Sequence, residues 1–158
     1  MKPINKNKII IATGGTGGHI FPACSLANFL IKNDYLVEIT TDRRGLKYLE
    51  RHKDIKLIIN NSATIFKKSI INLLFSMFKI FFSYIRSLVI LYRSRPMVVF
   101  GMGGHASFPV CIAARTLNIP FIIYENNIQI GKSNKYLLPF AFKIFVSYQD
   151  LDGIKKKT

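Results

Sequence analysis

Two short stretches of the sequence place a Gly-Gly-His triplet after an apolar run. GGTGGHIFPAC begins at Gly14 and contains His19, and GMGGHASFPVC begins at Gly101 and contains His105. Glycines at the start of a helix leave backbone N–H groups free to approach an anion. Imidazole is the side chain best matched to accept a proton near neutral pH. The two stretches therefore predict a site that binds phosphate and moves a proton, the alternative being tight turns without a ligand.

The glycine pattern does not match two common nucleotide-binding motifs. Ile20 stands where a Rossmann GxGxxG motif has its last glycine, and no lysine follows Gly18 as it would in a P-loop. The type of anion is therefore left open by this motif.

A third group of polar residues follows a later apolar run, PFIIYE. It consists of Glu125, Asn126 and Asn127, and Ser133 with Asn134 then opens the next helical stretch as expected caps. Glu125 has two possible roles, because a carboxylate there could bind a substrate hydroxyl or pair with a basic neighbour.

Strands and helices alternate along the chain and must position these groups. Short apolar runs predict strands over residues 8–13, 35–41, 55–60, 96–101, 120–126 and 143–148. Helical spacing predicts helices over residues 21–32, 44–52, 69–95, 109–117 and 133–141. This alternation predicts an α/β fold, a Rossmann-like parallel sheet with helices on both faces, in one domain spanning residues 1–158. Ligands of such sheets lie at the carboxyl ends of the strands, where the glycines fall.

The predicted helix over residues 69–95 has a wide apolar face. Its polar residues form one narrow stripe: Asn72, Ser76, Lys79, Ser83, Arg86, Ser87 and Arg93. Lys79 and Arg86 interrupt the apolar run, which argues against a membrane span. We expect the helix to lie on an anionic membrane surface through Phe75, Phe78 and Phe82 with those two cations; the alternative is a buried core helix.

The formal charge of +15 and pI of about 10.0 indicate a partner that is anionic: nucleic acid, a membrane surface or a phosphorylated substrate. We expect no nucleic acid, because the chain has no reading motif and its aromatic residues crowd one helix. Cys24 and Cys111 are far apart, without metal-ligand spacing, and read as buried residues of a reducing compartment. We expect neither a metal nor a cofactor.

The stretches ATGGTGGHIFPA, VVFGMGGHASFP and IIYENNIQIGKSNKYL, in this order, resemble the N-terminal half of the MurG family. These are peripheral glycosyltransferases that transfer N-acetylglucosamine from UDP-GlcNAc to lipid I, giving lipid II for bacterial peptidoglycan. The resemblance implies the N-terminal, acceptor-binding half of a GT-B fold. It also implies an inverting, metal-free reaction at the cytoplasmic face of the inner membrane.

The resemblance also implies roles for individual residues. His19 matches a candidate catalytic base at the acceptor site. The residues matched to UDP-GlcNAc binding are Thr16, Gly17, Gly18 and Asn127. Those matched to the acceptor side or the cleft are Gly103, Gly104, His105, Glu125 and Asn134.

The sequence departs from the family in three places. His105 replaces a usual Tyr, and Asn126 and Ile128 replace usual residues of the loop after Glu125. The domain that carries most donor contacts is not within these residues. This leaves several alternatives: a separately encoded half that needs a partner donor domain, a truncated inactive remnant, or half of an enzyme acting on another lipid.

Overall fold

The computed structural model describes residues 4–49, 52, 55–60 and 70–148. Their elements run in the order β1 (Asn5–Ala12), α1 (Gly17–Lys32), β2 (Leu36–Thr41), α2 (Arg43–Leu49), β3 (Lys56–Ile59), α3 (Ile70–Ser94), β4 (Pro96–Gly101), α4 (Ser107–Thr116), β5 (Phe121–Glu125), α5 (Lys132–Leu137), the short 3-10 helix η1 (Leu138–Phe140) and β6 (Lys143–Val146). Every strand and helix predicted from the sequence is present, with ends shifted by a few residues.

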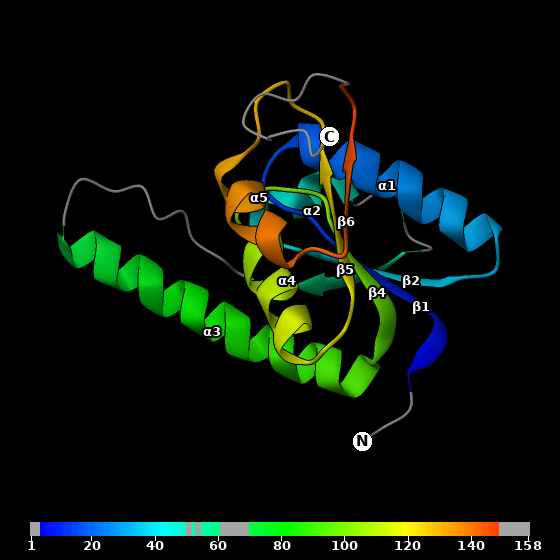
Figure 1. The fold of residues 1–158 in the computed structure, drawn as a ribbon, viewed down its shortest axis with the longest axis horizontal. Coiled ribbons are helices and arrows are strands. Elements are labelled where there is room, and N and C mark those ends of the chain that lie inside the picture. The colour runs from blue at the N-terminus through cyan, green and yellow to red at the C-terminus, as the bar shows by residue number, and fades with distance from the viewer. Residues whose placement is uncertain (1–3, 50–51, 53–54, 61–69, 149–158) are drawn as a thin grey trace.

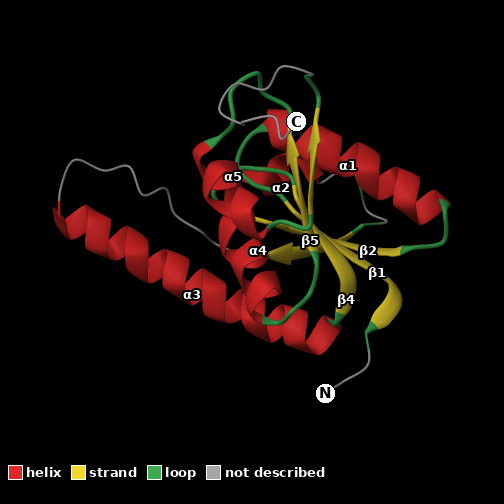
Figure 2. Ribbon diagram, in the orientation of Figure 1, coloured by secondary structure: helices red, strands yellow, loops and turns green. Residues whose placement is uncertain are grey.

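The strands form one parallel sheet in the order β3-β2-β1-β4-β5-β6. β1 and β4, the strands that precede the two Gly-Gly-His stretches, are direct neighbours at its centre. Their carboxyl ends therefore bring both stretches to the same edge, as predicted. Figure 2 shows the sheet between its helices, with the arrowheads of β5 and β6 at the top.

Two apolar cores fill the space between the sheet and the helices. Alternate residues of β1 point to opposite faces, so Ile9 and Ile11 pack with α1, whereas Ile10 and Ala12 pack with α3 and α4. The strands are buried on both faces, which explains why they read as continuous apolar runs. The Rossmann-like fold class is confirmed.

Helix α1 begins four residues earlier than the sequence indicated, so Gly17, Gly18 and His19 form its first turn. Pro22 then lies inside the helix and has no N–H to donate to the carbonyl four residues before it. That carbonyl, of Gly18, instead accepts a hydrogen bond from Asn126 Nδ2 at 2.7 Å. Asn126, 108 positions away in the sequence, thus supplies the hydrogen-bond donor that Pro22 lacks.

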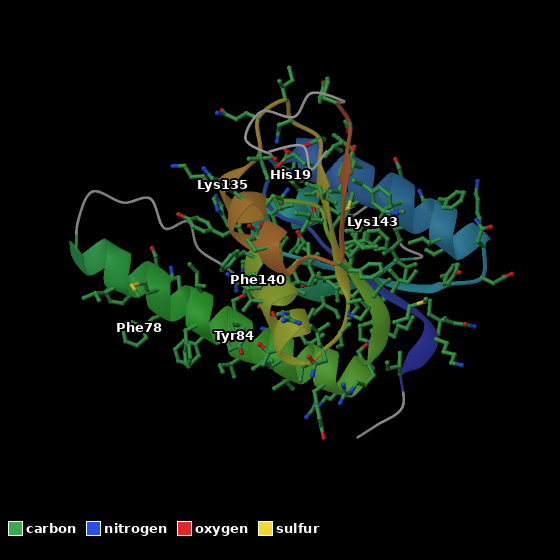
Figure 3. All side chains as sticks on the ribbon, in the orientation of Figure 1. His19, Phe78, Tyr84, Lys135, Phe140 and Lys143 are labelled. Atoms are coloured by element: carbon green, nitrogen blue, oxygen red, sulfur yellow. The ribbon has the colours of Figure 1, made fainter. Side chains whose placement is uncertain are left out.

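Helix α3 packs with its small polar residues inward. Ser76, Ser83 and Ser87 are buried, whereas Lys79 and Arg86 of the same predicted stripe are exposed. The large apolar side chains lie outside, and Figure 3 shows Phe78 pointing away from the domain. The alternative of an entirely buried core helix is therefore wrong.

A buried polar cluster fixes this rotation of α3. Asn60 follows β3 and donates from Nδ2 to Ser87 Oγ at 2.7 Å, and its Oδ1 accepts from Ser83 Oγ at 3.0 Å. Ser87 Oγ also donates to the Ser83 carbonyl at 2.7 Å. Turning the helix would leave the amide of Asn60 buried without partners, which is costly.

We expect Asn60→Ala to lower the free energy of unfolding by about 1–3 kcal/mol, because both serine hydroxyls lose their amide partner. Urea titration of the isolated chain measures this change. Asn7→Ala, at an exposed position of β1, serves as the control and should differ from the unmodified chain by less than about 0.5 kcal/mol. Equal losses in both variants would show that the buried cluster does not hold α3.

The segment Leu74–Ser94 of α3 is long and apolar enough, on length and composition alone, to cross a membrane. Lys79 and Arg86 therefore do not by themselves exclude a span, and the expectation that the helix does not cross a bilayer stays a prediction. What the contacts show is a helix packed along α4 and held by Asn60, with its N-terminal turns projecting beyond the sheet (Figure 1).

Candidate functional site

The two glycine turns pack directly against each other. Cβ atoms built on Gly14 and Gly104 would lie 2.7 Å from Ala106 Cβ and 2.8 Å from the Gly14 carbonyl oxygen. Gly103 and Gly104 also have φ angles of 87° and 78°, a region that side chains rarely adopt. The glycines are therefore needed to bring the backbones of the two turns together.

His19 lies at this junction. A Cβ on Gly103 would come within 2.9 Å of His19 Nδ1, so the second turn needs glycine to seat the imidazole of the first. Burial lowers the pKa of His19, opposed by the nearby Glu125 carboxylate and a hydrogen bond with the Met102 backbone. The imidazole is therefore mostly neutral at neutral pH, which is the form that accepts a proton.

His105 lies close to His19 but in a more cationic setting. Burial lowers its pKa, and the Arg44 guanidinium and His19 lower it further, whereas the Asp42 carboxylate raises it. The two Gly-Gly-His stretches are not equivalent in structure: His19 is the third residue of α1, whereas His105 precedes α4 by two residues. The same sequence pattern thus gives two different placements of the imidazole.

The first turn of α2, which follows β2 directly, adds a cation that the sequence analysis missed, Arg44. Asp42 Oδ2 accepts from Arg44 Nε and Nη2 at 3.1 and 2.7 Å, and its Oδ1 accepts from the backbone N–H groups of Arg44 and Gly45. A Cβ on Gly15 would lie 2.9 Å from Arg44 Nη2, so the guanidinium lies against the first glycine turn. The sequence could have indicated Arg44 by its position shortly after a strand, because the segments that follow parallel strands meet at one edge of the sheet.

Glu125 organises the loop after β5. The residue is 1% exposed, and its carboxylate accepts four hydrogen bonds from that loop and the start of α5. The donors are the Asn127 backbone N–H at 3.1 Å, Asn127 Nδ2 at 2.6 Å, the Gly131 N–H at 2.8 Å and Asn134 Nδ2 at 3.0 Å. Its hydrogen-bond partners are thus amides of the following loop and of α5, and none is a basic side chain. Binding of a substrate hydroxyl stays a prediction.

A pocket of about 240 Å³ opens where these groups meet. Seven of the sequence-predicted site residues line it: His19, Gly103, Gly104, His105, Glu125, Asn127 and Asn134. Gly131, Lys132 and Ser133 complete the lining and were not predicted as site residues. Figure 3 shows His19 at the carboxyl edge of the sheet, near α5.

Other predicted residues lie apart from this pocket or have different roles. Thr16, Gly17 and Gly18 form the start of α1 and do not line it. The expectation that Ser133 and Asn134 cap the next helix is wrong, because α5 begins after Gly131 and no side chain caps it. Asn134 instead donates to the Tyr124 carbonyl and to Glu125.

Within the described residues, no three His, Cys, Asp or Glu side chains are grouped as metal ligands. Both cysteines are free and buried, and burial raises the pKa of Cys111 to about 12. What the site offers is a neutral imidazole, a flanking guanidinium and backbone N–H groups at two glycine turns. This set can accept a proton from a hydroxyl and stabilise an anionic phosphate.

A Rossmann-like sheet with such a site at its carboxyl edge is typical of a domain that binds a phosphorylated ligand. Residues 9–146 match the glycosyltransferase family 28 N-terminal domain, and the chain belongs to that family. The resemblance inferred from the glycine and histidine stretches is thereby confirmed.

Similar proteins include enzymes named UDP-N-acetylglucosamine--N-acetylmuramyl-(pentapeptide) pyrophosphoryl-undecaprenol N-acetylglucosamine transferase. Those of Rickettsia typhi and Rickettsia prowazekii are 38% and 37% identical to this chain over 147 residues, which is 93% of this chain and 37% of each relative. The chain thus spans a little over a third of their length.

Among solved structures, Acinetobacter baumannii MurG superposes with a TM-score of 0.80 at 23% identity, over 94% of this chain and 44% of that one. A putative UDP-N-acetylglucosamine 2-epimerase from Listeria monocytogenes gives 0.65 at 15% identity, over 94% and 41%. At these sequence identities the two superpositions show that the folds are similar, and they assign no function.

Proposed function

We propose that this chain is the acceptor-binding half of an N-acetylglucosaminyltransferase that acts on a lipid-linked MurNAc-pentapeptide. The observation that carries the proposal is the pocket in which His19, both glycine turns and the Glu125 loop converge. The names of the curated relatives supply the substrates, UDP-N-acetylglucosamine as donor and the undecaprenol diphosphate-linked acceptor.

In this reaction His19 removes the proton from the acceptor sugar hydroxyl as its oxygen attacks the anomeric carbon of N-acetylglucosamine. The bond from that carbon to the diphosphate breaks, and UDP leaves with the electron pair. Attack opposite the leaving group inverts the anomeric centre. The lowered pKa of His19 keeps the imidazole ready as a base at neutral pH.

The other residues implied by the resemblance divide between the two substrates. Gly103, Gly104 and His105 contact the acceptor, and Glu125 holds Asn127 and Asn134 in place through its hydrogen bonds. Gly17 and Gly18, in the first turn of α1, present backbone N–H groups to UDP-GlcNAc, together with Thr16 and Asn127.

The donor-binding domain must come from other residues, because the relatives are more than twice as long as this chain. We expect a donor domain to act with residues 1–158, in the same polypeptide or as a separate chain. Affinity capture with the tagged chain tests the separate-chain arrangement. Capture of no donor-domain protein, together with an inactive fusion to the remainder of the Rickettsia typhi relative, would instead favour an inactive remnant.

The exposed face of α3 provides a contact with the cytoplasmic face of the inner membrane. Phe78 and Phe82 are 60% and 67% exposed, and Phe75 lies on the same face. Lys79, Arg86 and Arg93 follow one another at seven-residue spacing beside them, and all three are exposed. Aromatic residues can enter the lipid interface while the cations meet anionic headgroups. Lys67 and Lys68, which the sequence also places here, lie outside the described residues.

We expect the isolated chain to co-sediment with anionic vesicles. Phe78→Ser combined with Phe82→Ser should weaken this binding at least tenfold, because each phenylalanine contributes about 1.5–3 kcal/mol when it leaves water. Phe29→Ser is the matched control, since Phe29 is 63% exposed but lies on α1. Raising the salt concentration should weaken binding through screening of the cations.

Equal binding to neutral and anionic vesicles would contradict the role of the cations. Unchanged binding of a folded double variant would contradict the role of the aromatic face.

A further inference from the structure

Aromatic side chains of α1 and α2 lie beside the first glycine turn, next to Arg44. A Cβ atom on Gly17 would lie 2.9 Å from Phe21 Cε2 and 3.6 Å from Tyr48 Cε1. The two rings contact each other edge to face, with their centroids 5.8 Å apart. Phe21 is 60% exposed although it belongs to the second turn of α1. The start of α1 is therefore bordered by an aromatic surface that is open to a ligand.

Two cations flank these rings. Lys47 Nζ lies 4.9 Å from the centroid of the Tyr48 ring, and the Arg44 side chain is 56% exposed. Asp42 pairs with Arg44 through two of its N–H groups, so other N–H groups of this guanidinium remain for a ligand. Among the described residues no carboxylate forms an ion pair with Lys47. We call the four side chains the α1–α2 patch: Phe21, Arg44, Lys47 and Tyr48.

The α1–α2 patch lies on the opposite face of the sheet from α3. Helices α1 and α2 pack with Ile9 and Ile11 of β1, whereas α3 and α4 pack with Ile10 and Ala12. Figure 1 shows α1 and α3 on opposite sides of the sheet. A membrane that meets the exposed face of α3 therefore does not meet the patch, and the cations of the patch are available for a different anion.

We propose that the α1–α2 patch binds the peptide of the acceptor. In this arrangement Arg44 and Lys47 take the C-terminal carboxylate, and Phe21 and Tyr48 contact the side chains of the peptide. The inference rests on the proposed function, because that function supplies an acceptor that carries a pentapeptide on its muramyl sugar.

The geometry of the acceptor fits this placement. A muramyl sugar carries its diphosphate on C1 and its peptide on the lactyl group at C3, so the two substituents leave the ring in different directions. The prenyl chain leads from the diphosphate toward the membrane at α3, which leaves the other face of the sheet to the peptide. Five extended residues span at most about 18 Å. Because the two glycine turns pack against each other, a sugar at His19 lies within that reach of the patch.

The chemistry of the α1–α2 patch fits a peptide end. A peptide combines apolar groups with a terminal carboxylate, and the patch combines two exposed rings with two cations. An arginine fixed by a carboxylate is well suited to this task, because its planar donors are already oriented when the ligand arrives. The patch would therefore distinguish an acceptor with a charged peptide end from one whose end is neutral.

The test titrates the isolated, isotope-labelled chain with two soluble probes and follows the amide signals by NMR. The probes are N-acetylmuramyl-pentaalanine with a free C-terminal carboxylate and the same compound with a C-terminal carboxamide. We expect the carboxylate probe to bind about fivefold more tightly, since two exposed ion pairs contribute modestly. Both probes should shift the amides of His19 and Gly103, and the carboxylate probe should also shift those of Lys47 and Tyr48.

Variants separate the cations from the rings. Arg44→Ala combined with Lys47→Ala should bring the ratio of the two dissociation constants to about one. The control removes two exposed lysines far from the patch, Lys6 at the amino end of β1 and Lys32 at the end of α1, and should keep the ratio. Phe21→Ala should weaken both probes about threefold by the loss of apolar contact. Phe29→Ala, at a position 63% exposed near the other end of α1, should weaken neither.

Equal affinities for the two probes, or a ratio that survives loss of both cations, would overturn the assignment of the α1–α2 patch. If the amides of His19 and Gly103 still shift in that case, the acceptor site of the proposed function stands and only the peptide contact fails. Binding of neither probe would overturn the peptide contact and count against the acceptor site as well. UDP that shifts the Lys47 and Tyr48 amides at lower concentration than the carboxylate probe would assign the patch to the donor instead.

Discussion

Replacing His19 with alanine is expected to lower turnover by roughly 10²–10⁴-fold, the usual cost of losing a general base. The assay uses this chain fused to the remainder of the Rickettsia typhi relative, with UDP-GlcNAc and a lipid-linked acceptor. His19 is the imidazole seated against Gly103 at the junction of both glycine turns, so its loss removes the proton acceptor while the backbone of the site remains. The free energy of unfolding should change far less than turnover.

The pH dependence provides a second measurement of the same residue. Because burial lowers the pKa of His19 below 6.5, the fusion should keep its activity down to that pH and lose it as His19 becomes protonated. Stability should change in the same direction. The unfolded chain binds the proton more readily, so the contribution of His19 to folding is present above pH 6.5 and is lost as the pH falls through its folded pKa.

His52→Ala is the matched control, because His52 lies after α2, away from the pocket lining. Its turnover and pH profile should match those of the unmodified fusion. A folded His19→Ala variant with unchanged turnover would assign His19 a structural role and leave the reaction without its proposed base.

Glu125→Ala is expected to cause the largest loss of stability at the site, about 3 kcal/mol of the free energy of unfolding. The substitution leaves the buried Asn134 amide and the partly buried N–H of Gly131 without this acceptor, and each unsatisfied buried group costs about 1–3 kcal/mol. The amide of Asn127 is exposed and can bond to water instead. Urea titration of the isolated chain measures the loss. In the fusion enzyme, at a temperature where the variant stays folded, the KM for the acceptor should also rise, because the loop no longer holds Asn134.

Glu125→Gln distinguishes the loss of the hydrogen bonds to this carboxylate from the loss of side-chain volume. It keeps the size and one acceptor oxygen, but its amide group faces donors, so an intermediate loss is expected. If Glu125→Ala and the unmodified chain unfold at the same urea concentration, the four hydrogen bonds to this carboxylate do not stabilise the loop.

Much of the fold could be read from local sequence. The apolar runs ending at Thr13 and Gly101, each followed by glycines and a helical pattern, indicated strand, turn and helix, because β and α periodicities are visible within a few residues. The same reasoning brought His19 and His105 to one edge, since carboxyl ends of parallel strands meet there. It misplaced the start of α1, because glycines give no sign of whether they end a loop or begin a helix.

The rest depended on partners that are distant in the chain. Burial of the serine stripe of α3 follows from Asn60, and the role of Asn126 follows from the carbonyl that Pro22 leaves open. Arg44 reaches the first glycine turn only because Asp42 holds its guanidinium there. The sequence by itself determined the elements, the parallel sheet and the edge at which the glycines and histidines gather. The tertiary structure decided which face of α3 is exposed and which polar groups satisfy one another, because a buried hydrogen bond depends on the final positions of both partners.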